Sequence, residues 1–175
     1  MNADLLKSKI RHVPDFPKPG ILFYDITTLL RDAEGLRLAL DALAAPYLDT
    51  SIDLVVGMES RGFIFGAALA DRLGAGFVPV RKVGKLPAGT VRVTYDLEYG
   101  TDALEIHADA ITANQRVLIV DDLLATGGTA KATIELVAGL QSHIVACAFL
   151  VELTFLGGRA QLGDTPVHTV LRYDA

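Results

Sequence analysis

Residues 117–130 read VLIVDDLLATGGTA, and the change of character within this stretch decides the fold. Its first four residues are aliphatic and mostly β-branched, as in a strand that is buried on both faces of a parallel sheet. Two acids follow, Asp121 and Asp122, and then the small residues ATGGT at 125–129. Residues 130–140 have helical spacing, so this loop joins a strand to a helix. The order of elements predicts an α/β fold with a mostly parallel sheet.

The loop between strand and helix suits a phosphate group. It consists of Ala125, Thr126, Gly127, Gly128 and Thr129. Glycines let backbone N–H groups turn inward, threonines add hydroxyl donors, and a helix N-terminus adds partial positive charge. Ligands of open α/β sheets lie just beyond the carboxyl ends of the strands, which brings Asp121 and Asp122 within reach. The loop is neither a Walker A nor a GxGxxG loop, and an ordinary connection with capping Asp and Thr is the alternative interpretation.

Length and composition are those of a globular protein. The chain has 175 residues, which is enough for one sizeable core, so we expect a single domain over residues 1–175. Hydrophobic residues make up 51% of it, but no segment approaches the roughly 20 apolar residues that span a bilayer. The N-terminal stretch mixes charged and apolar residues, unlike a secretory signal. We therefore expect a cytoplasmic protein with no membrane partner.

Charge and cysteine content narrow the function further. The formal net charge is -5, whereas general nucleic-acid binders usually carry a basic excess, so we expect no nucleic-acid partner. Any site for a polyanion must then be local. Cys147 is the only cysteine and lies in the apolar residues 144–151, which predicts a small buried side chain and excludes an internal disulfide.

Periodicity predicts the other elements of the chain. Apolar residues at helical spacing indicate helices, short apolar runs indicate buried strands, and Gly and Pro mark turns. Helices are expected at residues 5–13, 31–46 and 63–73, strands at 52–57, 77–81, 144–151 and 167–171, and turn-rich or loop-like stretches at 15–20 and 153–164. The strands at 52–57 and 77–81 flank a helix, so these three elements form a βαβ crossover.

Residues 82–106 differ in character from the rest of the chain. Gly and Pro interrupt them, and Val91, Val93 and Tyr95 alternate with polar residues, which predicts half-buried antiparallel strands. We expect a flexible flap that could act as a lid. The positive residues at its start are Arg81, Lys82, Lys85 and Arg92. A solvated surface is the alternative interpretation of this cluster.

Three polar groups should meet at one rim of the sheet. They are Glu59, Ser60 and Arg61, the positive residues of the flap, and the loop with its two acids. Two separate anion sites indicate a ligand with two phosphate groups, and the acids between them could bind sugar hydroxyls. The pattern predicts a phosphorylated sugar with a second phosphate. In the alternative, Ser60 is a helix N-cap and Arg61 a surface side chain.

Signatures of other enzyme classes are missing from the sequence. The histidines His12, His107, His143 and His168 lack metal-ligand spacing, so we expect no metal site built by the protein alone. No GxSxG motif occurs, so the nucleophile elbow of a hydrolase has no support. Glu98 and Tyr99 follow the first strand of the flap. A turn is the simplest interpretation, but Glu98 could reach a reacting base as a proton acceptor or donor if the flap closes.

The stretch VLIVDDLLATGGTA resembles the phosphoribosyl-pyrophosphate (PRPP) signature of the type I phosphoribosyltransferases. Further stretches are similar to the adenine phosphoribosyltransferase family, namely DFPKPGILF, MESRGFIFG, VRKVGKLP, YDLEYGTDALEIH and LVEL. The resemblance implies the type I phosphoribosyltransferase fold, a central mostly parallel sheet flanked by helices, with an antiparallel flap and a small N-terminal hood at residues 1–33. It implies a glycosyltransferase (pentosyltransferase) of purine salvage that makes AMP and pyrophosphate from adenine and PRPP. It also implies Mg²⁺, bound mainly through PRPP or pyrophosphate, and a homodimer.

The resemblance implies roles for individual residues as well. Ala125, Thr126, Gly127, Gly128 and Thr129 would hold the 5′-phosphate of PRPP, and Asp121 and Asp122 its ribose hydroxyls. Pyrophosphate would be bound by Glu59, Ser60, Arg61, Arg81, Lys82, Lys85 and Tyr99. Leu22, Phe23 and Leu153 would line the adenine pocket, and Glu98 would manage the purine proton. A cis peptide bond is expected between Glu59 and Ser60. Many relatives carry Arg where this chain has Tyr24, so the resemblance implies no side-chain contact from that position.

Two other functions remain open at this point. The first is the same fold acting on another base, such as hypoxanthine, xanthine or orotate. The second is a regulator that senses PRPP and binds nucleic acid without catalysis. Such a regulator should show a basic face beyond the flap, and the overall acidity of the chain argues against it.

Overall fold

The computed structural model describes residues 3–96 and 101–174. The chain divides into two compact units, Met1–Ala42 and Leu43–Ala175. The expectation of one domain over residues 1–175, with a hood at 1–33 and a flap at 82–106, stays a prediction. Among the described residues, no helix is long and apolar enough to cross a membrane.

The first unit contains a β-hairpin between helices. Its elements are α1 (Ala3–Ser8), β1 (Arg11–Pro14), β2 (Leu22–Asp25), α2 (Thr27–Leu30) and α3 (Ala33–Ala44), the last of which runs across the boundary between the units. β1 and β2 pair antiparallel, from Arg11 opposite Asp25 to Pro14 opposite Leu22. The helix that was expected at residues 31–46 is α3 with the short 3₁₀ helix η1 (Ala45–Tyr47) after it.

The prediction of a helix at residues 5–13 is wrong for the second half of this segment. α1 ends at Ser8, and the following residues form β1. The Thr28 hydroxyl donates to the carbonyl oxygen of Lys9 at 2.7 Å and accepts from the N–H of Arg11 at 3.1 Å. These bonds use backbone groups that another helical turn would need, and pairing with β2 uses others. Partners distant in sequence therefore overrode the helical stripe.

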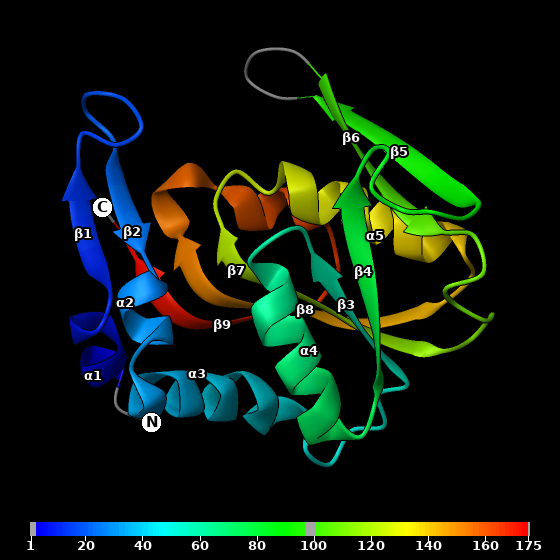
Figure 1. Ribbon diagram of the computed structural model, residues 1–175, viewed down its shortest axis with the longest axis horizontal. Helices are drawn as coiled ribbons and strands as arrows, with labels where there is room; N and C mark the ends of the chain where they lie inside the picture. The colour runs from blue at the N-terminus through cyan, green and yellow to red at the C-terminus, as the bar shows by residue number, and fades with distance from the viewer. Residues whose placement is uncertain (1–2, 97–100, 175) are drawn as a thin grey trace. The chain divides into compact units, whose positions relative to one another are not determined.

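The second unit is built on a mixed sheet (Figure 1). Within the described residues the sheet has seven strands in the order β5-β6-β4-β3-β7-β8-β9. The strands are β3 (Leu54–Met58), β4 (Gly76–Lys82), β5 (Thr90–Asp96), β6 (Thr101–His107), β7 (Arg116–Leu124), β8 (His143–Leu153) and β9 (Val167–Tyr173). The five strands from β4 to β9 in this order are parallel, and β6 and β5 continue the sheet antiparallel. This confirms the predicted α/β class and the βαβ crossover.

Two crossover helices flank this sheet, α4 (Gly62–Leu73) between β3 and β4, and α5 (Gly128–Gly139) between β7 and β8. They cover opposite faces, with α4 in front of the sheet in Figure 1 and α5 behind it. The segment that was expected to be a loop at 153–164 instead forms two 3₁₀ helices, η2 (Thr154–Leu156) and η3 (Gly158–Leu162). Single turns of this kind bury too few apolar residues to leave a periodic pattern.

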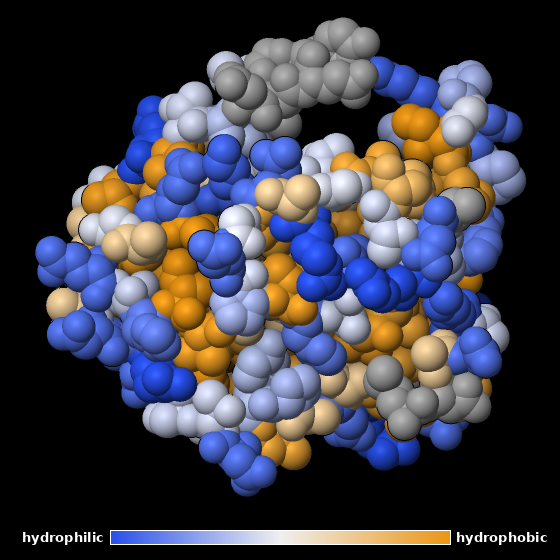
Figure 2. All heavy atoms as spheres, turned by 180° about the vertical axis from the view of Figure 1, so that it is seen from behind, coloured by the Kyte–Doolittle hydropathy of each residue, from blue (hydrophilic) through white to orange (hydrophobic). Residues whose placement is uncertain are grey.

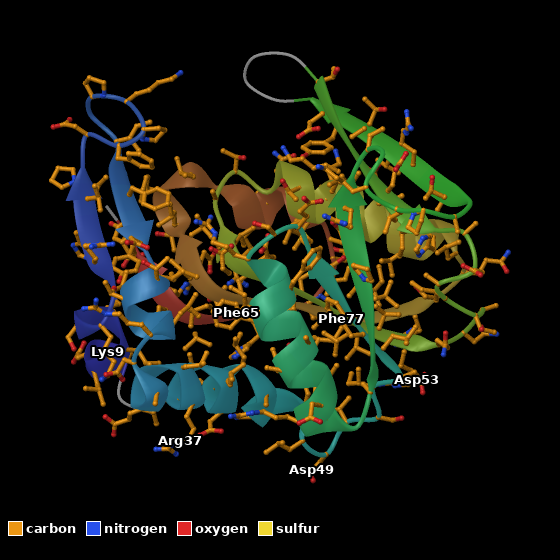
Figure 3. The ribbon with its side chains drawn as sticks, in the orientation of Figure 1. Lys9, Arg37, Asp49, Asp53, Phe65 and Phe77 are labelled. Atoms are coloured by element: carbon orange, nitrogen blue, oxygen red, sulfur yellow. The ribbon has the colours of Figure 1, made fainter. Side chains whose placement is uncertain are left out.

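Glycines allow α4 to lie close to the sheet. A Cβ on Gly57 of β3 would lie 2.7 Å from the ring of Phe77, and a Cβ on Gly66 of α4 would lie 2.8 Å from the same ring. The Phe77 ring, labelled in Figure 3 together with Phe65 of α4, thus fills the space that the two glycines leave. Phe65 is fully buried. The two glycines therefore let α4 pack closely against β3 and β4.

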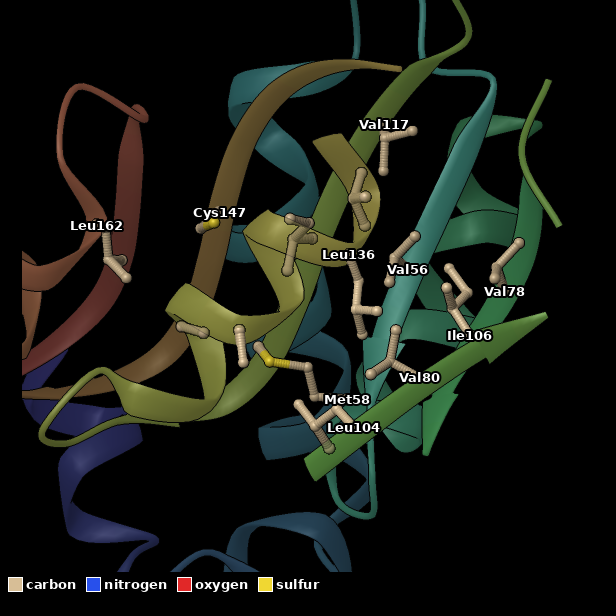
Figure 4. Packing of buried hydrophobic residues seen from close by; sticks show 14 of the residues in the cluster. Val56, Met58, Val78, Val80, Leu104, Ile106, Val117, Leu136, Cys147 and Leu162 are labelled. Atoms are coloured by element: carbon tan, nitrogen blue, oxygen red, sulfur yellow. The ribbon is translucent and has the colours of Figure 1, made fainter. Parts of the chain in front are cut away.

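The main core of the second unit lies between the sheet and α5 (Figure 4). Val56, Met58 and Val80 from the sheet and Leu136 from α5 belong to it. Cys147 of β8 is also part of this core and is 0% exposed, as its apolar surroundings predicted. Burial raises the pKa of the Cys147 thiol to about 12, so it is a poor nucleophile at neutral pH.

The predicted antiparallel strands of the flap are β5 and β6. They pair from Thr90 opposite His107 to Asp96 opposite Thr101. Val91, Val93 and Tyr95 are half-buried and pack on the core, while the residues between them are exposed, which confirms the alternation. Seen from behind the view of Figure 1, the surface shows hydrophobic residues among hydrophilic ones (Figure 2).

Candidate active site

The loop after β7 is shaped by its glycines. The two acids were expected to mark the carboxyl end of this strand, but β7 continues past Asp121 and Asp122 to Leu124. The helix begins at Gly128, two residues earlier than predicted. Gly127 precedes it with φ of 88°, and a Cβ there would collide with the carbonyl oxygen of Gly158. Only glycine fits at this position without strain.

A cavity of about 410 Å³ opens at the carboxyl ends of β3 and β7. It is lined by Glu59, Ser60, Arg61, Asp121, Asp122, Leu123, Leu124, Ala125, Thr126, Gly127, Gly128, Thr129, Ala130 and Phe149. All seven residues that were predicted to bind the phosphate and ribose of PRPP are among them. Three of the predicted pyrophosphate residues, Glu59, Ser60 and Arg61, lie there too. The cavity therefore brings together two segments that are 60 residues apart in the chain.

The two acids of β7 form a linked pair. The Asp122 side chain is buried, with the residue 5% exposed, and its Oδ2 lies 2.7 Å from Nε of Arg61. The N–H of Asp122 donates to Oδ1 of Asp121 at 2.8 Å. Burial, together with the neighbouring Asp122, raises the pKa of Asp121 well above its ordinary value. Burial also raises the pKa of Asp122, and the charge of Arg61 opposes that rise.

The start of α4 is adapted to these acids. A Cβ on Gly62 would lie 2.9 Å from Oδ1 of Asp121 and equally close to the carbonyl oxygen of Val120. Glycine at this position therefore lets α4 begin against β7. The neighbouring peptide bond, Glu59–Ser60, is cis, which confirms the expectation from the resemblance.

Glu59 joins the cavity to the basic residues at the end of β4. Its Oε2 accepts from the N–H of Lys82 at 2.9 Å and from Nε of Arg81 at 3.3 Å. Burial alone would raise the pKa of Glu59, but these two bonds outweigh it and lower the pKa. The carbonyl oxygen of Lys85 accepts from Nη1 of Arg81 at 3.1 Å.

Three of the four positive residues of the flap, Arg81, Lys82 and Lys85, were predicted to bind pyrophosphate, and these three do not line the cavity. They are connected to the cavity through Glu59, which accepts hydrogen bonds from Arg81 and Lys82, and Arg81 in turn donates to Lys85. Nζ of Lys82 is 3.2 Å from Oδ2 of Asp102 on β6, and the Tyr95 hydroxyl is 3.4 Å from the same oxygen. Lys82, one of the residues predicted to bind pyrophosphate, is thus connected to the flap strands β5 and β6. Glu98 and Tyr99 lie outside the described residues, and their roles stay predictions.

The residues predicted for the adenine pocket fall in both units. Leu22 and Phe23 belong to β2 of the first unit, where the Phe23 ring meets the ring of Phe16 edge to face at 5.1 Å. Leu153 is the buried last residue of β8 in the second unit. Their joint pocket stays a prediction. Tyr24 is buried, and its ring lies edge to face with that of His12 at 5.0 Å.

The sequence reasoning missed residues that support the loop from outside the cavity. Gly158 of η3 touches the loop, and a Cβ there would collide with the carbonyl oxygen of Ala125. Glu152 of β8 is 3% exposed and forms an ion pair with Arg159, the residue after Gly158. The pair of glycines at 157 and 158 was the one visible signal, because consecutive glycines often mark a close backbone approach.

Comparison with known proteins gives a consistent result. The sequence model of the phosphoribosyl transferase domain family matches residues 28–167 of the chain. An adenine phosphoribosyltransferase of Acidobacterium capsulatum is 63% identical over 173 residues, which cover 99% of this chain and 96% of the relative.

Solved structures agree with the sequence matches. The crystal structure of the adenine phosphoribosyltransferase from Rhodothermus marinus superposes with a TM-score of 0.93 at 57% identity, over 98% of each chain. The enzyme from Saccharomyces cerevisiae, solved in complex with an imino-altritol bisphosphate and adenine, has a TM-score of 0.92 and 46% identity. That match covers 97% of this chain and 98% of the yeast chain.

Proposed function

Because this chain belongs to the adenine phosphoribosyltransferase family, and so to the enzymes that transfer phosphoribose, we propose that it makes AMP and pyrophosphate from adenine and PRPP in purine salvage. The observation that carries the proposal is the cavity that gathers Asp121, Asp122 and the loop 125–129 with Arg61. Adenine in the yeast relative supports the choice of base.

The loop 125–129 would hold the 5′-phosphate. It leads directly into α5, and among the described residues no side chain caps that helix, which leaves its first N–H groups for a ligand. Backbone donors and the partial positive charge at a helix N-terminus favour a phosphate dianion. The hydroxyls of Thr126 and Thr129, which line the same cavity, would add two donors.

The acids of β7 would hold the ribose. A carboxylate accepts hydrogen bonds from two neighbouring hydroxyls, and Asp121 and Asp122 line the cavity next to the phosphate loop. Arg61 neutralises one of these charges at 2.7 Å, so the pair can remain buried. Arg61 also brings positive charge to the cavity, where the pyrophosphate of PRPP would need it.

Transfer of the ribosyl group requires stabilisation of the departing pyrophosphate. Arg61, with Ser60 beside it, would bind the leaving group inside the cavity, and Arg81, Lys82 and Lys85 would approach from the end of β4. Preorganised positive groups of this kind lower a barrier by several kcal/mol, on the order of 3 or 4 for one donor. Closure of the flap would exclude water that competes with adenine.

The donor set of the cavity fits a magnesium ion that arrives with its ligand. No group of three or more His, Cys, Asp or Glu able to hold a metal occurs in the described part of the chain. Mg²⁺ typically takes one or two carboxylates and completes its shell with phosphate oxygens and water, which the acids of the cavity can match. When bound, Mg²⁺ would neutralise negative charge on the pyrophosphate.

The base would bind between Leu22, Phe23 and Leu153, with Phe23 stacked on the purine. Glu98 would manage the purine proton, with Tyr99 beside it at the pyrophosphate. These roles rest on the family resemblance. The family also favours a homodimer in the cytoplasm, in which one or more of the basic residues reach across to the other subunit. The whole chain would act as one phosphoribosyltransferase domain with a hood and a flap.

A substrate panel tests the proposal. Purified protein is incubated with PRPP, Mg²⁺ and adenine, hypoxanthine, xanthine or orotate, and pyrophosphate and nucleotide are measured. Adenine should be converted far faster than the other bases. Faster turnover of another base would show that this base, and not adenine, is the preferred substrate. PRPP binding without pyrophosphate release from any base would instead favour the regulator.

A further inference from the structure

The phosphate loop rests on the backbone of Gly158. A Cβ on Gly127 would collide with the Gly158 carbonyl oxygen, and a Cβ on Gly158 would collide with the Ala125 carbonyl oxygen. The two chain segments therefore approach each other through their backbones. Since interiors are closely packed, a shift of Gly158 must be passed on to the loop.

Gly158 is in turn fixed through its neighbour, Arg159. Nε of Arg159 donates to Oε1 of Glu152 at 2.9 Å, and Nη2 donates to Oε2 at 2.6 Å. Nη1 donates to the carbonyl oxygen of Val167 at 3.0 Å. These three hydrogen bonds connect η3 to both β8 and β9, and the planar guanidinium group restricts the position of η3.

Glu152 is suited to act as the fixed end of this contact. It is 3% exposed and also accepts from the Thr169 hydroxyl at 3.0 Å. The hydrogen bonds from Arg159 lower the pKa of Glu152 more than burial raises it. The carboxylate is therefore charged at neutral pH and held rigidly in the sheet. Neither Glu152 nor Arg159 lines the cavity, so neither would touch the substrate there.

We propose that Glu152 and Arg159 are positioning residues that hold Gly158 against residues 125–127 and so set the geometry of the phosphate loop. The inference rests on the proposed function, in which this loop binds the 5′-phosphate of PRPP. Breaking the pair should loosen the loop, because η3 would lose its attachment to β8. PRPP binding should then suffer selectively.

The test compares Arg159→Gln with Arg172→Gln. Nε of Arg172 lies 3.3 Å from Oε2 of Glu152. However, Arg172 is on β9, its side chain is 57% exposed, and it is not adjacent to Gly158 in the chain. We expect Arg159→Gln to raise KM for PRPP by about tenfold or more, because the charge-assisted hydrogen bonds to Glu152 are lost, with KM for adenine within about twofold. Arg172→Gln should change both by less than about twofold.

Two further variants keep the inference testable if Arg159→Gln does not fold. Arg159→Lys retains the charge but loses the fork, so it should raise KM for PRPP by less than Arg159→Gln does. Gly158→Ala forces the loop away directly and should raise KM for PRPP selectively. Equal changes in both KM values, or equal effects of the Arg159 and Arg172 substitutions, would overturn the positioning role. Absence of AMP formation by the wild type would instead contradict the proposed function.

Discussion

Asp121 and Asp122 show how a single site can contain two neighbouring carboxylates. Water is largely removed from both, which by itself favours their neutral forms. Two interactions oppose that tendency. Arg61 lies 2.7 Å from Asp122, and Asp121 accepts a hydrogen bond from the backbone N–H of Asp122. Each acid thus has its own partner that favours its charged form. Asp122, the acid with the cationic partner, is the one to change.

Asp122→Asn should reduce the rate of AMP formation by about tenfold or more, because hydrogen bonds to a charged group are worth on the order of 1.5–3 kcal/mol. The variant keeps the shape of the side chain and removes the charge that pairs with Arg61. Steady-state rates with saturating adenine measure the effect. Asp71→Asn, at an exposed position of α4, is the matched control and should behave as wild type. Unchanged turnover in Asp122→Asn would remove these acids from the site.

Glu98→Ala should lower turnover more than it weakens adenine binding. A group that handles a proton acts mainly in the transition state, whereas a binding group acts equally in the ground state. Turnover and the dissociation constant for adenine are measured side by side on the purified variant. Proportional losses in the two quantities would indicate a binding role for Glu98 instead.

At the scale of elements, the contact of α4 with the sheet depends on glycines. Gly66→Ala should lower the free energy of unfolding by about 1–3 kcal/mol, because the new methyl group would press on Phe77 and on the backbone of Gly57. Gly139→Ala is the control, since a Cβ at that end of α5 would meet nothing within 4 Å. It should be neutral or stabilising by up to about 1 kcal/mol. Urea unfolding of both variants decides the point, and equal stability would argue against close packing at Gly66.

The hairpin of β1 and β2 should respond to acid. Hydrogen bonds from Thr27 and Arg11 lower the pKa of Asp25 from 3.8 to about 2. Since the folded pKa is below the unfolded one, the stabilisation is present above pH 3.8 and is lost as pH falls towards 2. The difference in unfolding free energy between wild type and Asp25→Asn should therefore shrink from pH 6 to pH 2.5.

Urea unfolding at several pH values measures this difference. The control is Asp49→Asn, whose side chain is exposed (Figure 3). Its effect on stability should stay nearly constant over the same pH range. A difference for Asp25→Asn that does not change with pH would contradict the role of these hydrogen bonds.

At the scale of the whole molecule, the sequence predicted what depends on local pattern. The buried strand of β7, the crossover around α4 and the alternation in β5 all follow from periods that burial imposes on one segment at a time. The acids and the ATGGT loop could be read as an anion site because their residue types and order carry the chemistry. The cavity that joins this loop to Glu59, Ser60 and Arg61 follows from parallel pairing of β3 and β7.

What the sequence did not predict depends on partners distant in the chain. Thr28 ends α1 through bonds to Lys9 and Arg11, which a helical stripe does not encode. Gly158 supports the phosphate loop from a segment that shows no regular period. Likewise, β7 continues past Asp121 and Asp122 to Leu124 because β8 pairs alongside it. Such contacts arise from the tertiary fold, so no window of neighbouring residues contains them.

The central claim is that the loop 125–129 holds the 5′-phosphate of the nucleotide. A crystal structure of the chain with AMP bound tests it most directly. We predict phosphate density within hydrogen-bond distance of the backbone N–H groups of this loop and of the Thr126 and Thr129 hydroxyls, with the ribose hydroxyls at Asp121 and Asp122. Phosphate density outside the cavity formed by residues 59–61 and 121–130 would contradict the account.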